Sequence, residues 1–271
     1  MISIMTCGDA YYFKFLKIFE ANIFQIYSAH PTIYDLGLTK DQLNELKSAI
    51  YQTVTDNKYF KKNSKNCIYA THKPYCILDF LKKQANDCLY MDADTLSTEK
   101  IQSNLFSQFD IAVTPRHNKE KKPSHLKNGL LNSGVIFFKN TNPVIDFIEQ
   151  WIQACARSEC SDQEALSLLL SREVDLLNGP AIQKFGGLTV GLLDPSEFND
   201  VSCSTGRVLH FKNAARKKEA WQQYVNAAAT LKKYPRYILF KTTIARTVSR
   251  TLSIALKSPR NFIHNHLKNF I

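Results

Sequence analysis

Residues Asp87–Leu96 have the sequence DCLYMDADTL, in which an apolar run that ends at Met91 is followed by two aspartates, Asp92 and Asp94. The run has the length and composition of a buried strand. A buried strand that ends in acids delivers them to the carboxyl edge of a sheet, where open α/β folds bind their ligands. Alternate residues of an extended chain point the same way, so both carboxylates can address one site. The stretch therefore predicts an α/β sheet with a polar site at its edge.

The chain before this stretch predicts alternating strands and helices. The pattern starting at Thr39 and Gln42 is typical of a capping box, and Pro74 suits the first turn of a helix. Alternation of this kind favours a sheet with helices on both faces. We expect strands at residues 2–5, 22–28 and 67–70, and helices at 10–20, 39–54 and 74–84.

The chain after this stretch continues the alternation. Residues 115–129, PRHNKEKKPSHLKNG, form a polar, basic loop between two expected strands, long enough to have a function. Ser161 and Glu164 have the spacing of a second capping box. We expect strands at 110–114, 134–139, 174–178 and 206–211, and helices at 143–156, 161–170 and 217–233.

The basic character of the chain is confined to its end. The net charge is +11, but the 52 residues after Glu219 carry nine Lys or Arg and no acid, which leaves 26 bases against 24 acids before them. We expect one domain at residues 1–233 and a basic amphipathic helical tail at 234–271. At helical spacing the apolar residues Tyr237, Phe240, Ile244, Val248, Leu252 and Ala255 share one face, and Arg246, Arg250 and Lys257 lie opposite.

Cysteine usage and hydropathy indicate a cytoplasmic protein. The seven cysteines are an odd number without paired CxxC spacing, and Cys67, Cys76 and Cys88 fall in apolar segments, as reduced thiols do. The start, MISIMTCGDAYY, lacks a basic region, and no apolar run reaches the roughly 18 residues of a spanning helix. We therefore expect a protein that is neither secreted nor membrane-spanning.

The paired aspartates suggest a metal. Two carboxylates so close together repel each other, and a divalent cation removes that cost. Oxygen ligands suit Mg²⁺ or Mn²⁺, which often bridge to substrate phosphates. Judged alone, the pair is equally consistent with Asp92 capping the next turn and Asp94 being solvated.

Several motifs, taken in order, resemble those of the GT-A nucleotide-sugar glycosyltransferases. The similarity is to the metal-dependent group that includes glycogenin-like enzymes and bacterial lipopolysaccharide galactosyl- and glucosyltransferases, and it covers residues 1 to about 215. This resemblance implies a Rossmann-like GT-A fold with a mixed central sheet. The motifs are MTCGDAYY (5–12), YDLGLT (34–39), THKPYCILDFL (71–81), YMDADTL (90–96), LLNSGVIFFKN (130–140), SDQEALSL (161–168) and VLHFKN (208–213).

The resemblance implies a role for each matching residue. It makes Asp92, Asp94 and His210 the ligands of Mn²⁺ or Mg²⁺, and Asp162 and Gln163 the pair beside the reacting anomeric carbon. It also implies that the following residues bind the UDP-sugar: Thr6, Asp9 and Tyr11 (base and ribose), Lys73 (near the sugar diphosphate), Asp92 (ribose) and its neighbour Ala93, Asn132 and Ser133 (donor sugar and acceptor), and Lys212 (β-phosphate).

Several of these residues also have an ordinary structural explanation. Tyr11 is equally typical of a core aromatic, and Lys73 of a solvated lysine. A histidine such as His210 is often a satisfied structural residue, and Asp162 favours a first helical turn through the helix dipole alone. The segment Asn132–Gly134 is also compatible with a simple turn. After His210 the family commonly has a Gly-Pro or similar small segment, where this chain has KNAARKK.

The sequence thus predicts a glycosyltransferase that moves a sugar from a UDP-sugar to an acceptor hydroxyl, with retention. We expect a surface glycan or lipid-linked acceptor, and an anionic membrane surface bound by residues 234–271. One alternative is a haloacid-dehalogenase-type phosphatase, although its D-x-D motif normally lies near the N-terminus and continues differently. Another is a non-catalytic module whose tail binds nucleic acid, but a nucleic-acid surface more often spreads bases and aromatics over the domain. We expect no nucleic-acid partner. The tail is also compatible with a helix packed on the domain.

Overall fold

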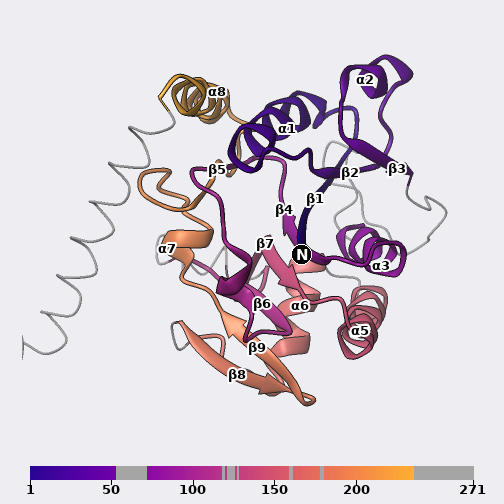
Figure 1. Ribbon diagram of the computed structural model, residues 1–271. Coiled ribbons are helices and arrows are strands. Elements are labelled where there is room, and N and C mark those ends of the chain that lie inside the picture. The colour runs from indigo at the N-terminus through magenta and orange to yellow at the C-terminus, as the bar shows by residue number, and fades with distance from the viewer. Residues whose placement is uncertain are drawn as a thin grey trace, which may run out of the picture.

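The computed structural model describes residues 1–52, 72–117, 120, 126, 128–158, 161–177 and 180–234, except the side chains of residues 157 and 158 (Figure 1). The strand predicted at 67–70 and the tail predicted at 234–271, apart from its first residue, lie outside this part. None of the described helices has the length and apolar character needed to cross a membrane.

One mixed sheet of eight strands organises the molecule, in the order β3-β2-β1-β4-β7-β6-β9-β8. Strands β3, β2, β1 and β4 are parallel, and β7 runs antiparallel to β4 and β6. The carboxyl end of β4 therefore lies beside the first residues of β7. The bounds are β1 Ile2–Gly8, β2 Thr32–Asp35, β3 Ala49–Gln52, β4 Asp87–Met91, β6 Ile111–Pro115, β7 Leu131–Phe138, β8 Ala181–Phe185 and β9 Leu188–Leu192.

Helices cover both faces of this sheet, as the sequence predicts, with α3 beside α5 and α1 beside α8 (Figure 1). Their amphipathic spacing buries one side of each against the strands. The bounds are α1 Phe13–Tyr27, α2 Lys40–Glu45, α3 Lys73–Lys83, α5 Asn142–Ser158, α6 Asp162–Leu170, α7 Pro195–Phe198 and α8 Lys218–Lys233, with a 3₁₀ turn, η1, at Ser103–Phe106.

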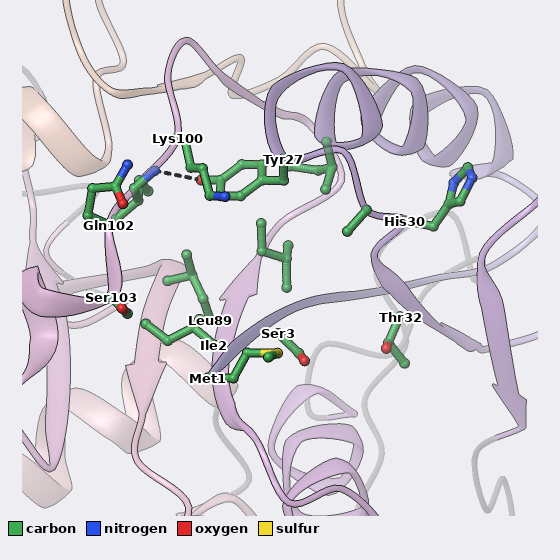
Figure 2. A pocket seen from close by; sticks show the side chains of 14 residues that line it. Met1, Ile2, Ser3, Tyr27, His30, Thr32, Leu89, Lys100, Gln102 and Ser103 are labelled. Carbon is green, nitrogen blue, oxygen red and sulfur yellow. Dashed lines mark hydrogen bonds between the residues drawn. The ribbon is translucent and has the colours of Figure 1, made fainter.

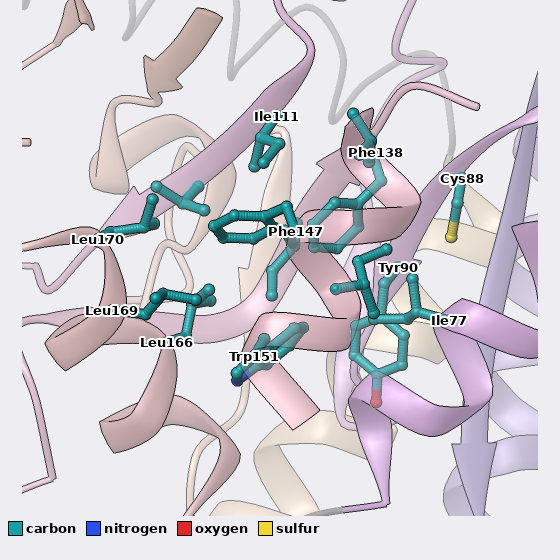
Figure 3. Packing of buried hydrophobic residues seen from close by; sticks show 14 of the residues in the cluster. Ile77, Cys88, Tyr90, Ile111, Phe138, Phe147, Trp151, Leu166, Leu169 and Leu170 are labelled. Atoms are coloured by element: carbon teal, nitrogen blue, oxygen red, sulfur yellow. The ribbon is translucent and has the colours of Figure 1, made fainter. Parts of the chain in front are cut away.

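The pleat of β4 divides its side chains between two cores. Tyr90 packs with Phe138 of β7 and Trp151 of α5 on one face (Figure 3), and Leu89 points into the opposite core beside Phe19 of α1. All five side chains are at most 2% exposed. Truncating a buried aromatic of this kind typically costs about 3 to 5 kcal/mol. Both cores thus fix β4, the strand that leads into the two aspartates.

A second, two-stranded sheet lies next to the first. Strand β5 (Thr95–Ser97) begins directly after Asp94 and pairs antiparallel with β10 (Val208–His210), with His210 opposite Thr95. The sequence predicts β10 but not β5. This pairing brings the chain near residue 210 to the end of β4, more than 100 residues earlier.

Three predictions of secondary structure are wrong. Residues 22–28, expected to be a strand, continue α1, because Phe15, Phe19 and Ile23 form one helical stripe of buried residues. The helix expected at 39–54 stops after Glu45, and its second half contains β3, which pairs with β2. The strand expected at 174–178 is absent from its described part, residues 174–177. A hairpin, β8–β9, turns at Gly186 instead and was not predicted.

Candidate active site

The two aspartates stand in a tightly bonded turn at the carboxyl end of β4. The Asp92 N–H donates to the Gly134 carbonyl at 2.8 Å, and the Asp92 carbonyl accepts from both the N–H and the hydroxyl of Thr95. The Asp94 carbonyl accepts from the N–H of Phe211. Because the backbone is bonded on both sides, the directions of the two carboxylates are set by the fold.

His210 completes a cluster with these carboxylates. Its Nε2 lies 3.2 Å from Oδ1 of Asp94. One donor atom from each of Asp92, Asp94 and His210 lies within 4.8 Å of the other two. Ligands of one small divalent cation can be at most about 4.2 Å apart, twice a metal–oxygen distance of about 2.1 Å. Two carboxylate oxygens and an imidazole nitrogen at this spacing fit such an ion after a shift of a few tenths of an ångström.

A buried lysine lies on the other side of Asp92. The Nζ of Lys73, at the start of α3, is 3.0 Å from Oδ1 of Asp92 and 3.3 Å from Oδ2 of Asp162. It also donates to the carbonyl and the hydroxyl of Ser133, at 2.7 and 2.9 Å. The Tyr90 hydroxyl donates to the same Oδ1 of Asp92 at 3.0 Å. Among the described residues both of these contacts are made to Oδ1, which leaves Oδ2 available to a cation.

The charges of this group shift one another's pKa values. Burial has the largest effect on Lys73 and lowers its pKa, yet Asp92 and Asp162 together raise it above the ordinary lysine value. Burial would also raise the pKa of Asp92, but Lys73 and then His210 outweigh it and hold that pKa below its usual range. Burial raises the pKa of Asp162, and Lys73 offsets this only in part. Two carboxylates, Asp92 and Asp162, thus lie beside the one ammonium group, and Asp94 adds a third negative charge on the other side of Asp92, an excess that attracts a divalent cation.

The start of β7 and the first turn of α6 are joined through side chains. The Ser133 hydroxyl donates to Oδ2 of Asp162 at 3.0 Å, and Gln163 accepts the Ser133 N–H at 3.2 Å and donates to the Asn128 carbonyl at 2.9 Å. Asn132 accepts the N–H of Gly134, while its buried Nδ2 has no partner among the described residues. The segment Asn132–Gly134 is part of β7, so it is not the simple turn considered from sequence.

The loop after β1 holds the next group of predicted residues. Oδ1 of Asp9 accepts from the N–H groups of Tyr11 and Tyr12, both at 3.1 Å, and burial raises the Asp9 pKa. Its Oδ2 and the Thr6 hydroxyl are buried and have no partner within the described ranges. Tyr11 donates its hydroxyl proton to the Ala215 carbonyl, in the segment that follows His210. Two unpaired acceptors thus lie beneath a loop that is tied to the histidine segment.

Comparison with known proteins identifies the family. The family model described as nucleotide-diphospho-sugar transferase matches residues 35–233. The chain belongs to this family. Two solved structures with similar folds are a galactosyltransferase, LgtC, in complex with donor and acceptor sugar analogues (14% identity, TM-score 0.48) and an active-site mutant of LgtC (12% identity, TM-score 0.53). Each match covers 85% of this chain and 96% of the LgtC chain. No curated protein matches the sequence.

The family confirms the glycosyltransferase predicted from sequence, and the second LgtC match supports the GT-A fold. The transferase fold also accounts for the position of the cluster at the carboxyl edge of a parallel β-α-β unit. The phosphatase alternative has no support from the family match. At such low identity the LgtC structures show the shared fold and nothing about the sugar.

Two charged residues near the candidate site, Glu120 and Arg216, were not singled out from the sequence. Lys212, predicted to bind phosphate, forms an ion pair with the buried Glu120, and Glu120 also lies 3.5 Å from Arg116. Arg216, four residues after Lys212, is exposed. Burial, Asp94 and Asp92 raise the pKa of Tyr12, and Arg216 lies close enough to offset this in part. No sequence pattern distinguishes Glu120 or Arg216 from the other charged residues of their loops.

Helix α8 supports the turn between the two aspartates. The carbonyl of Ala93 accepts a hydrogen bond from the buried Tyr224 hydroxyl at 3.0 Å. Trp151 of α5 likewise donates to the Asp162 carbonyl at 2.8 Å. The polar groups of two core aromatic residues, Tyr224 and Trp151, thus donate hydrogen bonds to backbone carbonyls of the candidate site.

Two cavities of the described part of the chain lie away from this cluster. One of about 460 Å³ is at the opposite edge of the sheet, where β1 and β2 begin, with Ile2 and Leu89 at its base and Lys100 and His30 at its ends (Figure 2). Another of about 910 Å³ lies between α1 and α8. Neither contains a residue of the carboxylate cluster, so the candidate active site is defined by its side chains.

Proposed function

We propose that Asp92, Asp94 and His210 hold Mn²⁺ or Mg²⁺, and that this enzyme transfers a sugar from a UDP-sugar to an acceptor hydroxyl. The observation that carries the proposal is the convergence of three donor atoms within 4.8 Å, at a strand edge in a nucleotide-diphospho-sugar transferase. When bound, such an ion supplies Lewis-acid stabilisation of the departing nucleoside diphosphate.

The surrounding residues suit the other parts of the donor. The unpaired Asp9 carboxylate oxygen and Thr6 hydroxyl offer hydrogen-bonding positions for a base or ribose, and Tyr11 offers an aromatic face. The unpaired amide of Asn132 suits a sugar hydroxyl. We assign Ala93 to the donor site through its backbone, which Tyr224 fixes.

The remaining predicted residues set the charges around the proposed position of the anomeric carbon and the diphosphate. Lys73 keeps Asp92 ionised and separates it from Asp162, whose raised pKa makes it a weaker acid. Gln163 is held by backbone groups at both ends of its amide, which fixes its position beside Ser133. We assign Lys212 and the exposed Arg216, together with Lys73, to the diphosphate of the donor. Reaction with retention follows from the resemblance and is part of the proposal.

We further propose that the acceptor is a surface glycan or a lipid-linked sugar, and that the enzyme works in the cytoplasm at the inner face of a membrane. The basic, acid-free sequence of residues 234–271 supports this location, because each Lys or Arg near an anionic surface contributes about 1 kcal/mol. The proposed domain boundary after residue 233 rests on the same change to a basic, acid-free sequence.

Donor hydrolysis tests the function directly. The purified protein is incubated with individual UDP-sugars and Mn²⁺ or Mg²⁺, and release of UDP is measured, with chelation by EDTA as the metal-free state. We expect turnover of at least one UDP-sugar that EDTA abolishes. Asp94→Asn should reduce this turnover by 100-fold or more, about 3 kcal/mol, because the neutral amide no longer offers an anionic ligand.

Asp146→Asn is the matched control, because Asp146 is an exposed carboxylate of α5 and its substitution changes net charge equally. Hydrolysis of simple phosphomonoesters without turnover of any nucleotide sugar would contradict the proposal, as would equal activity of Asp94→Asn and Asp146→Asn. The anomeric configuration of the first product, followed by NMR, tests retention separately.

A further inference from the structure

The histidine of the proposed metal site is held by a residue that the sequence motifs do not include. Nδ1 of His210 lies 2.5 Å from Oδ1 of Asn199, which is fully buried at the end of α7. An amide oxygen can only accept, so Nδ1 carries the ring proton and donates it to Asn199. Nε2 of a neutral His210 is then left with a lone pair.

That lone pair points at another electron-pair donor. Nε2 of His210 is 3.2 Å from Oδ1 of Asp94. Two lone pairs at this distance repel each other unless a proton or a metal cation lies between them. The bond from Asn199 therefore prepares Nε2 of His210 as a ligand for a cation shared with Asp94.

Asn199 is itself held by a rigid loop. Its neighbour, Asp200, has a buried carboxylate that accepts four backbone N–H bonds of 2.8 to 3.0 Å from the residues that follow it. The N–H of Asp200 donates to Val208 and its carbonyl accepts from His210, both at 3.0 Å, so the loop is bonded to β10. The backbone next to Asn199 is thus fixed both within its own loop and against β10, the strand that carries His210, and this sets the position of the Asn199 side chain.

The imidazole ring of His210 also lies close to the backbone of Gly134. A Cβ built on Gly134 would lie 2.5 Å from Cε1 and 2.8 Å from Nδ1 of His210, closer than carbon atoms pack. Glycine at position 134 therefore lets the imidazole lie against β7. The glycine thus allows the position of the ring, and the hydrogen bond to Asn199 selects its tautomer.

We propose that Asn199 is a positioning residue, which holds His210 in the Nδ1–H tautomer and aims Nε2 at the cation shared with Asp94. The inference depends on the metal site of the proposed function. A ligating histidine is commonly oriented by the partner of its other ring nitrogen, and losing that partner typically weakens metal binding about 10- to 100-fold.

Three variants in one loop test the proposal. Asn199→Ala removes the acceptor, and Asn199→Asp keeps an acceptor oxygen of the same shape. Ser202→Ala removes a hydroxyl whose partners among the described residues are Asp200 and Ser204, so it changes the same loop without touching the His210 ring. Mn²⁺ affinity is measured by calorimetry, and long-range ¹H–¹⁵N NMR of the metal-free protein at alkaline pH reports the tautomer of His210.

We expect the Nδ1–H tautomer in the wild type, Asn199→Asp and Ser202→Ala, and a mixed population in Asn199→Ala. Mn²⁺ affinity should fall about 10- to 100-fold in Asn199→Ala and stay near the wild-type value in the other two. An Nε2–H tautomer in the wild type would overturn the inference, as would equal affinities of Asn199→Ala and Ser202→Ala. Mn²⁺ binding unaffected by His210→Ala would contradict the proposed metal site itself, whereas binding that needs His210 but not Asn199 would contradict only the positioning role.

Discussion

Lys73 is a buried ammonium group whose charge is balanced by the two carboxylates beside it, Asp92 and Asp162. Lys73→Met should destabilise the protein by about 3 to 5 kcal/mol, because Asp92 and Asp162 are then left without a cation. Urea unfolding measures this loss. Adding Asp162→Asn to Lys73→Met should restore part of it, since one uncompensated charge is removed. Lys82→Met is the control, because the exposed Lys82–Glu149 pair contributes no more than about 1 kcal/mol.

A loss in Lys73→Met no larger than that in Lys82→Met would show that water reaches the cluster and replaces the lysine. The position of Lys73 at a strand-to-helix junction was predicted, but its burial was not, because a lysine carries no sequence signal for burial. The partners that make burial tolerable come from residues 92, 133 and 162, which only the fold brings together.

Asp200 makes the stability of the fold depend on pH. Burial, the largest effect, would raise the pKa of Asp200, but hydrogen bonds from Ser202 and from the N–H groups of Ser204, Thr205 and Gly206 hold it below the usual range. Because the folded pKa is below the unfolded value of about 3.9, the carboxylate contributes stability above that pH. The contribution is lost as the pH falls from there through the folded pKa.

Asp200→Asn should therefore lower the free energy of unfolding at pH 7 by about 1.5 to 3 kcal/mol, the range for hydrogen bonds to a charged group. Its stability should also fall less than that of the wild type between pH 7 and strongly acidic pH. Urea unfolding at several pH values tests both statements, with the exposed Asp146→Asn as control. A variant that loses as much stability on acidification as the wild type would show that Asp200 is not responsible.

At the level of elements, periodicity predicts the strands and helices whose burial is one-sided and continuous. The strand before Asp92, α3, α5 and α6 were placed within a few residues. The pattern failed where apolar residues suit two structures: residues 22–28 have the composition of a strand, but the buried stripe of α1 continues through Ile23. It also failed at β5, whose three residues are too few to show a period.

The residues of the candidate site likewise fall into those that the sequence predicts and those that it does not. Motif order placed Asp92, Asp94 and His210 in one site, and the structure brings them together. Asn199 and Tyr224 were not predicted, because each acts through a hydrogen bond across many residues of chain and belongs to no motif. Long-range polar contacts of this kind depend on tertiary packing alone.

Tyr224 is the link between α8 and the aspartate turn. Tyr224→Phe removes the hydroxyl that bonds the Ala93 carbonyl and leaves that buried acceptor unpaired. We expect a loss of about 1 to 3 kcal/mol in the free energy of unfolding, and weaker Mn²⁺ binding because the turn is less restrained. Tyr234→Phe is the matched control, since Tyr234 is 47% exposed. Unchanged stability and Mn²⁺ affinity in Tyr224→Phe would show that the turn is held by β4 and β5 alone.

At the scale of the whole molecule, charge separates two parts of the chain. Residues 1–219 are nearly neutral, while residues 235–271 contain seven Lys or Arg and no Asp or Glu. A neutral body does not draw an enzyme to a surface, whereas seven cations near an anionic membrane could contribute up to about 7 kcal/mol before screening. The proposed attachment therefore belongs to the tail and should be separable from catalysis.

A variant that ends at Lys233 tests this separation. In sedimentation with vesicles, the full chain should bind phosphatidylserine-containing membranes, bind neutral phosphatidylcholine vesicles weakly and dissociate as salt is raised. The shortened variant should bind neither and should keep its hydrolysis of UDP-sugar, because the predicted ligands lie before residue 213. Equal vesicle binding by both chains would contradict the anchor. Tighter, salt-dependent binding of the full chain to duplex DNA would favour a nucleic-acid partner, and a large loss of stability on shortening would favour a tail that packs on the domain.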